Sequence, residues 1–260
     1  MNFQEYTNDL ILILISCILI SIYLMLATKL ILYQNLLYFP FFFHYFKYIS
    51  IIIPIYNRLI FLNQTLHSAL SQNIPVSNGI EIICVDDCSI EPTTNFIIQL
   101  MKSNPKIKLI QHLYNQGTFH SRVHGIYHSC GKYIISLDSD DLFYPNSIQP
   151  LYEFSQQVDA DVIDYKAQCG KRKKLYTLDW SPCDRNFTNN REIKVGFLNI
   201  SLGFNIWKKM IKRSLLIKGL SCICPFFENK KILYAEDVAI LGAAFLFASN
   251  YFCTKIPVYI

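Results

Sequence analysis

Between residues 49 and 137 the chain alternates short apolar runs with segments whose apolar residues recur at helical spacing. The apolar runs are ISIIIPIYN from Ile49, EIICVDD from Glu81, KIKLIQH from Lys106 and KYIISLD from Lys132. Strands covered on both faces of a parallel sheet have this continuous apolar character. The order therefore predicts β-α-β-α-β-α-β, an α/β domain with a largely parallel sheet.

The segments between these runs carry helix signals. Leu62, Leu66 and Ala69 recur at helical spacing after the first run, and the turn-forming stretch NIPVSNG follows. IEPTTNFIIQLMKSN has a proline, Pro92, near its start, as the first turn of a helix allows. TFHSRVHGIYHS, from Thr118, is expected to form the next helix. Further along, ADVIDY indicates a strand and EDVAILGAAFLFAS a helix that begins with two acids.

Acidic side chains gather where two of the predicted strands end. Asp86 and Asp87 close the second run, and Asp138, Asp140 and Asp141 follow the fourth. Ligands of open α/β sheets bind beyond the carboxyl ends of the strands. The sequence therefore predicts a binding site at this edge of the sheet.

Carboxylates placed so close together repel one another unless a cation compensates them. Mg²⁺ and Mn²⁺ prefer oxygen ligands and are commonly held by one or two carboxylates together with substrate phosphates. In an extended segment Asp138 and Asp140 point the same way. The plain alternative is a polar turn, in which Asp141 caps a helix that begins at LFYP.

Charge and cysteine content exclude some classes of protein. The net charge is +5, but the densest basic run, GKRKKL at 170–175, is short. We interpret that run as a solvated loop first and as a contact with lipid headgroups or an anionic ligand second. No nucleic-acid-binding pattern accompanies it. The nine cysteines lack paired metal or disulfide spacings, so we expect reduced, mostly buried thiols.

The segment Leu10–Ala27 is uncharged and about long enough to cross the roughly 30 Å hydrocarbon core of a bilayer. We predict a single transmembrane helix there, followed by an aromatic segment, Leu30–Tyr48, that forms an interfacial belt or a second, re-entrant membrane contact. Lys29 and Lys47 follow the span, whereas acids precede it, so the rest of the chain is expected to face the cytoplasm. The predicted division is thus a membrane anchor at 1–48 and an α/β domain at 49–260.

Six sequence blocks occur in a characteristic order. SIIIPIYNR, EIICVDDCS, NQGTFHSRVHG and GKYIISLDSDDLFYP are followed by NIWKKMIKRSLL and YAEDVAI. Together they resemble the family 2 glycosyltransferases of the GT-A fold. The resemblance implies a Rossmann-like, mostly parallel sheet covered by helices, with a nucleotide-sugar-binding half at 49–145 and an acceptor half at 146–260.

The activity implied by this resemblance is the inverting transfer of a sugar from a UDP-sugar, or another nucleotide-diphosphate sugar, to a hydroxyl of a glycan or lipid-linked acceptor. Mg²⁺ or Mn²⁺ is the implied cofactor. The processive-synthase signature Q-x-x-R-W is absent from the sequence, so non-processive transfer is expected.

The resemblance also implies roles for ten residues. Asp87 would recognise the uracil base, Asp86 would organise its loop, and Asp140 would be the direct metal ligand. The general base is drawn from Glu236 and Asp237, and we assign it to Asp237. The remaining positions match nucleotide, ribose or metal contacts: Pro54, Tyr56, Asn57, Arg122 and Asp138. His124 departs from the family, which often has asparagine there, and we expect it to be a pocket-wall or packed histidine rather than a ligand.

Three alternatives to an active glycosyltransferase remain. A catalytically inactive glycosyltransferase-like binding protein would keep the same acidic residues. A receiver-like signalling domain would have its acidic pair at the end of the first strand, whereas here a strand and a helix precede Asp86. A sugar nucleotidyltransferase would need a glycine-rich basic loop after the first strand, and PIYNRLIFL lacks one.

Overall fold

The computed structural model describes residues 48–75, 79–90, 92–167, 169–171, 174–176, 185–228, 230–232 and 234–260. All of them fall in one compact unit, residues 47–260. Within these ranges, no helix combines the length and apolar character that a membrane crossing requires. The span expected at 10–27 lies outside the described residues.

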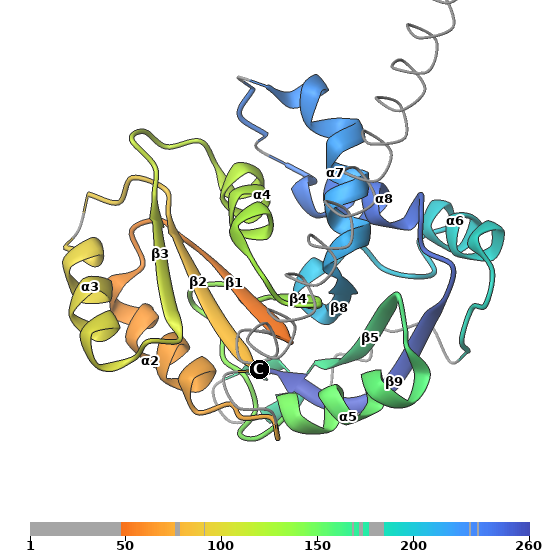
Figure 1. The fold of residues 1–260 in the computed structure, drawn as a ribbon, viewed down its shortest axis with the longest axis horizontal. Helices are drawn as coiled ribbons and strands as arrows, with labels where there is room; N and C mark the ends of the chain where they lie inside the picture. The colour runs from red at the N-terminus through yellow and green to blue at the C-terminus, as the bar shows by residue number, and fades with distance from the viewer. Residues whose placement is uncertain are drawn as a thin grey trace, which may run out of the picture. The chain divides into compact units, whose positions relative to one another are not determined.

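In the described part of the chain, seven strands form one sheet in the order β3-β2-β1-β4-β8-β5-β9 (Figure 1). The strands are β1 Ile49–Ile55, β2 Ile80–Asp86, β3 Ile107–Gln111, β4 Tyr133–Ser136, β5 Val162–Ala167, β8 Lys209–Lys212 and β9 Tyr251–Tyr259. The pairs among β1 to β4 are parallel, and β8 runs antiparallel to both β4 and β5. A separate short hairpin joins β6, Cys169–Lys171, to β7, Lys174–Tyr176.

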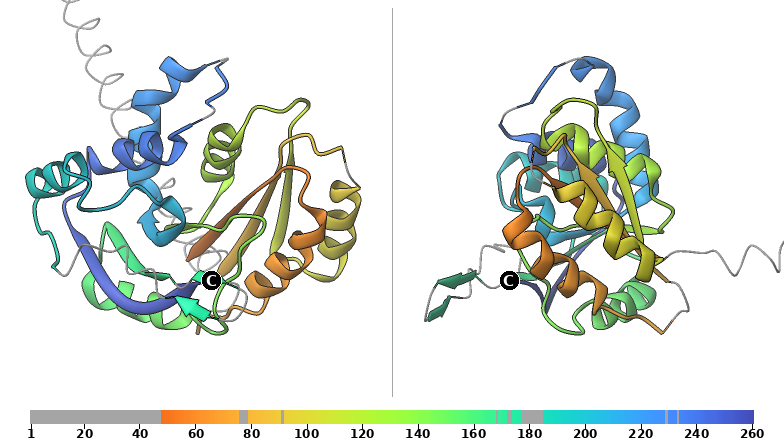
Figure 2. Two further views of the ribbon diagram at one scale, coloured as in Figure 1. Left: turned by 180° about the vertical axis from the view of Figure 1, so that it is seen from behind. Right: turned by 90° about the vertical axis from the view of Figure 1, so that its left-hand side faces the viewer.

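Helices cover both faces of the sheet (Figures 1 and 2). They are α2 Leu59–Leu70, α3 Thr93–Ser103, α4 Thr118–His128, α5 Ile148–Val158, α6 Asn190–Leu198, α7 Arg213–Phe227 and α8 Glu236–Phe245, with a 3₁₀ turn at Ile206–Lys208. Residues of α2, α3 and α5 belong to one apolar cluster, and residues of α4, α6, α7 and α8 belong to the other. This confirms the α/β class and the layered, mainly parallel sheet predicted from the strand pattern.

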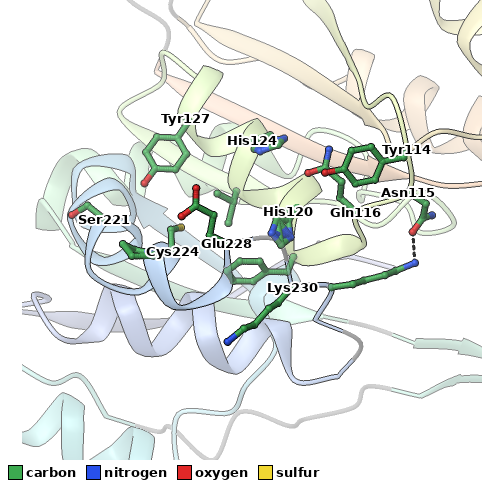
Figure 3. A pocket seen from close by; sticks show the side chains of 14 residues that line it. Tyr114, Asn115, Gln116, His120, His124, Tyr127, Ser221, Cys224, Glu228 and Lys230 are labelled. Carbon is green, nitrogen blue, oxygen red and sulfur yellow. Dashed lines mark hydrogen bonds between the residues drawn. The ribbon is translucent and has the colours of Figure 1, made fainter.

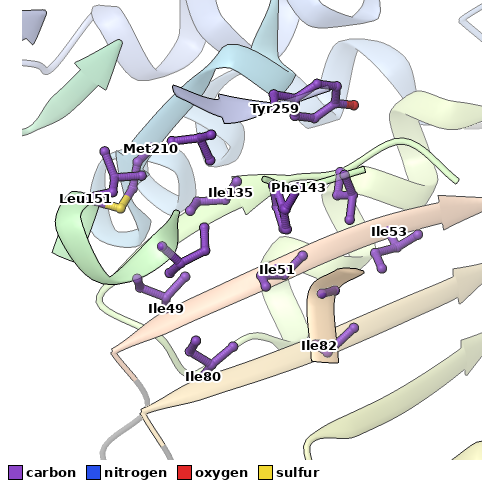
Figure 4. Packing of buried hydrophobic residues seen from close by; sticks show 14 of the residues in the cluster. Ile49, Ile51, Ile53, Ile80, Ile82, Ile135, Phe143, Leu151, Met210 and Tyr259 are labelled. Atoms are coloured by element: carbon purple, nitrogen blue, oxygen red, sulfur yellow. The ribbon is translucent and has the colours of Figure 1, made fainter. Parts of the chain in front are cut away.

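The two cores follow from side-chain alternation in the isoleucine-rich strands. In β1, Ile49, Ile51 and Ile53 enter the cluster beneath α2 and α5, where Figure 4 shows them beside Ile80 and Ile82 of β2. Ile52 points to the opposite face and packs beneath α4. A β-carbon on Gly125 would lie 2.4 Å from Ile52 Cγ2, so only glycine lets α4 approach β1 this closely. This contact fixes the height of α4, and hence of Arg122, above the sheet.

The structure excludes the capping alternative for Asp141 and corrects one expectation about the cysteines. Asp141 caps no helix, because α5 begins only at Ile148 and makes no side-chain cap; instead, the Asp141 carboxylate accepts a hydrogen bond from Tyr259. The expectation of reduced, mostly buried thiols is wrong for the cysteines that the structure describes. Cys253 is disulfide-bonded, and of five free cysteines among the described residues only Cys84 is buried, the others being Cys88, Cys130, Cys222 and Cys224.

Candidate active site

A cavity of about 320 Å³ opens beyond the carboxyl ends of β1, β2 and β4. It draws residues from five separate parts of the chain, which the parallel topology brings to one edge of the sheet. The lining residues are Pro54, Ile55, Tyr56, Arg58, Asp87, Thr118, Ser121, Arg122, Asp138, Ser139, Asp140 and Glu236. Seven of the ten predicted site residues are among them; Asn57, Asp86 and Asp237 lie just behind this lining.

Asn57 and Asp86 tie together the loops that follow β1 and β2. Asn57 has a left-handed backbone with φ of 53°, which asparagine tolerates well. Its backbone N–H donates to Ser89 Oγ at 3.1 Å, and its side-chain oxygen accepts from the Ile90 N–H at 2.8 Å. The fully buried Asp86 accepts from the Ser89 N–H and from the Thr94 hydroxyl. Both side chains therefore shape the rim of the cavity.

Asp87 is buried and anchors the loop that follows β3. Its Oδ1 accepts from the Gln116 N–H and from His112 Nδ1, both at 2.7 Å. Its Oδ2 accepts from the Gly117 N–H, also at 2.7 Å. A carboxylate offers about four acceptor positions. One position on Oδ2 therefore remains, and Asp87 borders the cavity.

Arg122 of α4 joins the acidic groups of the two halves of the chain. Its guanidinium is 4% exposed and donates to Asp138 at 2.8 Å, to Asp237 at 2.5 Å and to Glu236 at 3.3 Å. Its Nε donates to Ser136 Oγ at 3.3 Å. Burial alone would lower the pKa of Arg122, and the surrounding carboxylates outweigh that effect and raise it. The arginine therefore stays cationic while three carboxylates share its single charge.

Glu236 and Asp237 form the first turn of α8, where the helix dipole favours negative charge. Glu236 faces the cavity, whereas Asp237 is turned toward Arg122 and also accepts from the Ile206 N–H at 3.2 Å. Burial raises the pKa of Asp237; Arg122 and the Ile206 amide oppose this shift, and Asp138 and Glu236 add to it. A carboxylate with a raised pKa is better suited to accept a proton near neutral pH.

The segment after β4 is held in place by Tyr259 of β9. The Asp138 N–H donates to the Tyr259 hydroxyl at 3.1 Å, and that hydroxyl donates to Asp141 Oδ2 at 2.9 Å. Tyr259 is itself buried, with its ring 4.8 Å from that of Trp207. Burial raises the pKa of Asp141 to about 6, with Asp138 and Asp140 contributing and the Tyr259 hydrogen bond opposing.

Asp140 differs from the carboxylates around Arg122 because it is exposed to solvent and, among the described residues, has no close cationic partner. Its side chain is 43% exposed and its nearest cation is Arg58, at 4.0 Å. Arg58, Tyr259 and His112 are site residues that sequence reasoning missed. Arg58 directly follows the first-strand motif and could have been found from that position. Nothing in the sequence pattern singles out Tyr259 or His112.

The donor set suits a divalent cation that arrives with a phosphate group. Three carboxylates share the charge of Arg122, and Asp140 has only a distant partner, so negative charge exceeds positive charge around the cavity. In the described ranges, no group of three or more His, Cys, Asp or Glu side chains is arranged to hold a metal ion by itself. Mg²⁺ and Mn²⁺ are commonly held by one or two carboxylates together with substrate phosphates.

A second cavity, of about 660 Å³, lies on the other side of α4, toward α7. Figure 3 shows Tyr114, His120, His124 and Tyr127 around it. Nδ1 of His120 is buried without a hydrogen-bond partner. The lining includes Tyr114 and Gln116, so this cavity borders the loop that Asp87 anchors. Arg122, on the other side of α4, faces the first cavity.

Fold and site together define an α/β protein with an acidic cavity at the carboxyl ends of its parallel strands. The chain belongs to the Glycosyl transferase family 2, whose model matches residues 50–220.

Among curated proteins, the chain is 32% identical over 115 residues to the glycosyltransferase GlyG of Streptococcus pneumoniae, covering 44% of this chain and 37% of GlyG. It is 35% identical over 107 residues to the minor teichoic acid biosynthesis protein GgaA of Bacillus subtilis, covering 40% and 24%. The chain thus spans well under half the length of these relatives.

Among solved structures, Staphylococcus aureus TarS 1–349 in complex with UDP superimposes with a TM-score of 0.64 at 21% identity, covering 82% of this chain and 59% of that one. The mannosyltransferase PcManGT of Pyrobaculum calidifontis, in complex with GDP-Man and Mn²⁺, gives a TM-score of 0.55 at 16% identity, covering 83% and 57%. At these identities the likeness shows a shared fold.

Proposed function

We propose that the protein is a metal-dependent, inverting, non-processive glycosyltransferase that uses a UDP-sugar, or another nucleotide-diphosphate sugar, as donor. One observation carries the proposal: Arg122 links Asp138, which follows β4, to Glu236 and Asp237 of α8 at the edge of one cavity. The link joins a motif suited to a metal-bound diphosphate to a pair suited to proton transfer. The TarS complexes with UDP and UDP-GlcNAc support a uridine donor.

In the proposed donor complex the nucleotide lies along the ends of β1 and β2. The open position on Asp87 Oδ2 accepts the imide N–H of uracil. Tyr56, which is 45% exposed at the cavity, packs against the nucleoside. Asp138 and Asp140 are the residues that would hold Mg²⁺ or Mn²⁺. When bound, Mg²⁺ or Mn²⁺ supplies positive charge that stabilises the departing diphosphate.

In the proposed reaction Asp237 accepts the proton of the acceptor hydroxyl as that oxygen bonds to the anomeric carbon. The bond between that carbon and the diphosphate oxygen breaks, and UDP leaves with the electron pair. Arg122 and the Ile206 N–H each hold one oxygen of Asp237 and so orient it. Glu236, which faces the cavity, orients the acceptor hydroxyl or sugar beside it.

The acceptor is proposed to be a glycan or a lipid-linked glycan at a membrane. The uncharged segment 10–27 would anchor the chain, with the α/β domain on the cytoplasmic side. Two relatives favour a cell-surface polymer: GgaA, named for minor teichoic acid biosynthesis, and a poly(ribitol-phosphate) beta-glucosyltransferase of Bacillus spizizenii, which is 32% identical over 115 residues and covers 44% of this chain and 18% of that relative.

The test is a donor screen with the full chain purified in detergent. UDP release is measured from UDP-glucose, UDP-galactose and UDP-N-acetylglucosamine, with Mn²⁺, with Mg²⁺ or with chelator. We expect turnover of at least one donor that requires the metal. An inactive binding protein would bind UDP by calorimetry without turning over any donor. A receiver-like domain would bind no UDP and would instead become phosphorylated by acetyl phosphate.

A further inference from the structure

We propose that His112, supported by His124, is a positioning residue that makes the cavity selective for uridine over cytidine nucleotides. The inference rests on the proposed function, because it concerns how the nucleotide base is recognised. It starts from a continuous hydrogen-bonded chain, Asp87–His112–His124, in which each link measures 2.7 Å.

The proton on one ring nitrogen of His112 is determined by its partner. His112 Nδ1 faces Asp87 Oδ1, an acceptor that also receives the Gln116 N–H. Nδ1 must therefore carry a hydrogen and donate it, whichever way the proton lies between His112 and His124. Both Asp87 oxygens are thus held by donors, and the carboxylate can only accept at its remaining position.

Burial and support make this arrangement rigid. His112 is 5% exposed, and its backbone N–H donates to the Asp86 carbonyl at 2.9 Å, which fixes its position directly after β3. Its second ring nitrogen is held by His124 Nδ1, and the two rings meet edge to face. His124 borders the second cavity (Figure 3), and burial together with three neighbouring histidines lowers its pKa. A ring held at both nitrogens cannot turn away from Asp87.

The consequence for recognition is chemical. Uracil presents an imide N–H at the position where cytosine presents an acceptor nitrogen. A carboxylate fixed as an acceptor pairs with the first and repels the second. Without the His112 donor, Asp87 Oδ1 loses one of its two hydrogen bonds, and the carboxylate gains freedom to rotate. Selectivity should then fall more than general nucleotide affinity.

The experiment measures UDP and CDP dissociation constants by calorimetry, with Mn²⁺, for the full chain and four variants. His112→Leu removes both ring nitrogens at similar volume, and we expect about tenfold weaker UDP binding with CDP binding nearly unchanged. His112→Asn keeps a donor toward Asp87 and should restore most of the UDP affinity. His124→Leu removes only the outer link and should weaken UDP binding about threefold. His128→Leu is the matched control on the helix that carries His124, because the His128 ring is exposed and bonds to the His124 backbone carbonyl, outside the Asp87–His112–His124 chain.

The KM for the UDP-sugar should rise about tenfold in His112→Leu, in step with the weaker UDP binding, whereas His128→Leu should keep the wild-type KM. Thermal unfolding without nucleotide monitors folding, and His124→Leu and His112→Asn keep the test informative if His112→Leu is unstable. A purely structural role would weaken UDP and CDP equally, and that result overturns the inference. Absence of UDP binding by the wild-type protein would overturn the proposed function itself.

Discussion

Two clusters of buried charge lie at opposite ends of the same parallel strands, and they differ in their charge balance. At the amino ends, the fully buried Glu81 of β2 accepts from the Ser50 hydroxyl and the Cys130 N–H, both at 2.6 Å, and pairs with Lys108 at 2.6 Å. At the carboxyl ends, Arg122 is shared by three carboxylates that remain 22–30% exposed at a cavity.

The difference separates a structural cluster from a candidate site. Glu81 has one cation for its one charge and hydrogen bonds besides, so nothing further is needed to compensate it. The Arg122 cluster keeps an excess of negative charge and open space next to it, which a metal-bound diphosphate would fill. Burial of a charge alone therefore does not indicate function, whereas incomplete compensation beside a cavity does. The predictions below test this distinction, from the largest expected effect to the smallest.

The largest effect is expected for Asp237→Asn. The amide keeps the shape of the carboxylate but cannot take up the acceptor proton, so turnover should fall about 10³-fold. UDP affinity by calorimetry should stay within about threefold of wild type. Glu236→Gln is the companion variant and should lose less turnover. If Glu236→Gln proves the more damaging change, the base is Glu236.

Arg122→Met should affect both turnover and folding. The side chain keeps an unbranched apolar stem, but three carboxylates lose their common cation, so UDP release should fall about 100-fold. Because those carboxylates are partly exposed, the free energy of unfolding in urea should fall by only about 2 kcal/mol. Arg122→Lys should recover little activity, since an ammonium cannot reproduce the forked geometry. Full activity in Arg122→Met would remove the central role given to this residue.

Glu81→Gln should affect only stability. The variant keeps neutral hydrogen bonds but loses the ion pair with the half-exposed Lys108, so the free energy of unfolding should fall by about 1 kcal/mol. UDP affinity and turnover should equal those of wild type. A loss of UDP binding at unchanged stability would contradict the separation of the two clusters.

Glu81 should also make the stability of the folded protein depend on pH in the acid range. Burial tends to raise the pKa of Glu81, but hydrogen bonds from Lys108, Ser50 and the Cys130 amide outweigh it, so the pKa lies below the ordinary 4.5. A lowered pKa contributes stability above the unfolded-state value, and that contribution is lost as pH falls through the folded-state value. The urea midpoint should therefore decrease below about pH 4.5, and less steeply in Glu81→Gln. Equal slopes in the two proteins would refute this assignment.

Much of the region from β1 to β4 could be predicted from sequence, because its strands and helices are local and alternate regularly. The segment expected to be helical from Thr118 forms α4, Thr118–His128, and the acidic groups follow β2 and β4 as the strand pattern indicated. Because the carboxyl ends of parallel strands lie at the same edge of a sheet, Asp87 and Asp138 could be placed at one edge from the strand pattern alone.

The region after β4 depends on long-range pairing that local patterns do not encode. β8 inserts antiparallel between β4 and β5. Tyr259 reaches back 118 residues to Asp141, and Arg122 spans 115 residues to Asp237. Arg122 was expected as a nucleotide contact. Its hydrogen bonds to three carboxylates could not be inferred, because they depend on long-range pairing that places α8 beside α4. The roles of the predicted site residues, the metal and the membrane anchor stay predictions.

The most direct test of the account is calorimetric titration of UDP into the full chain with and without Mn²⁺, for wild type, Asp140→Ala and Asp159→Asn. Asp159 is the matched control because its carboxylate is exposed and pairs with Lys132, just before β4, and with Lys212, the last residue of β8. We expect Mn²⁺ to tighten UDP binding at least about tenfold in wild type and Asp159→Asn, and not in Asp140→Ala. Equal enhancement by Mn²⁺ in wild type and Asp140→Ala would contradict the metal-dependent donor site.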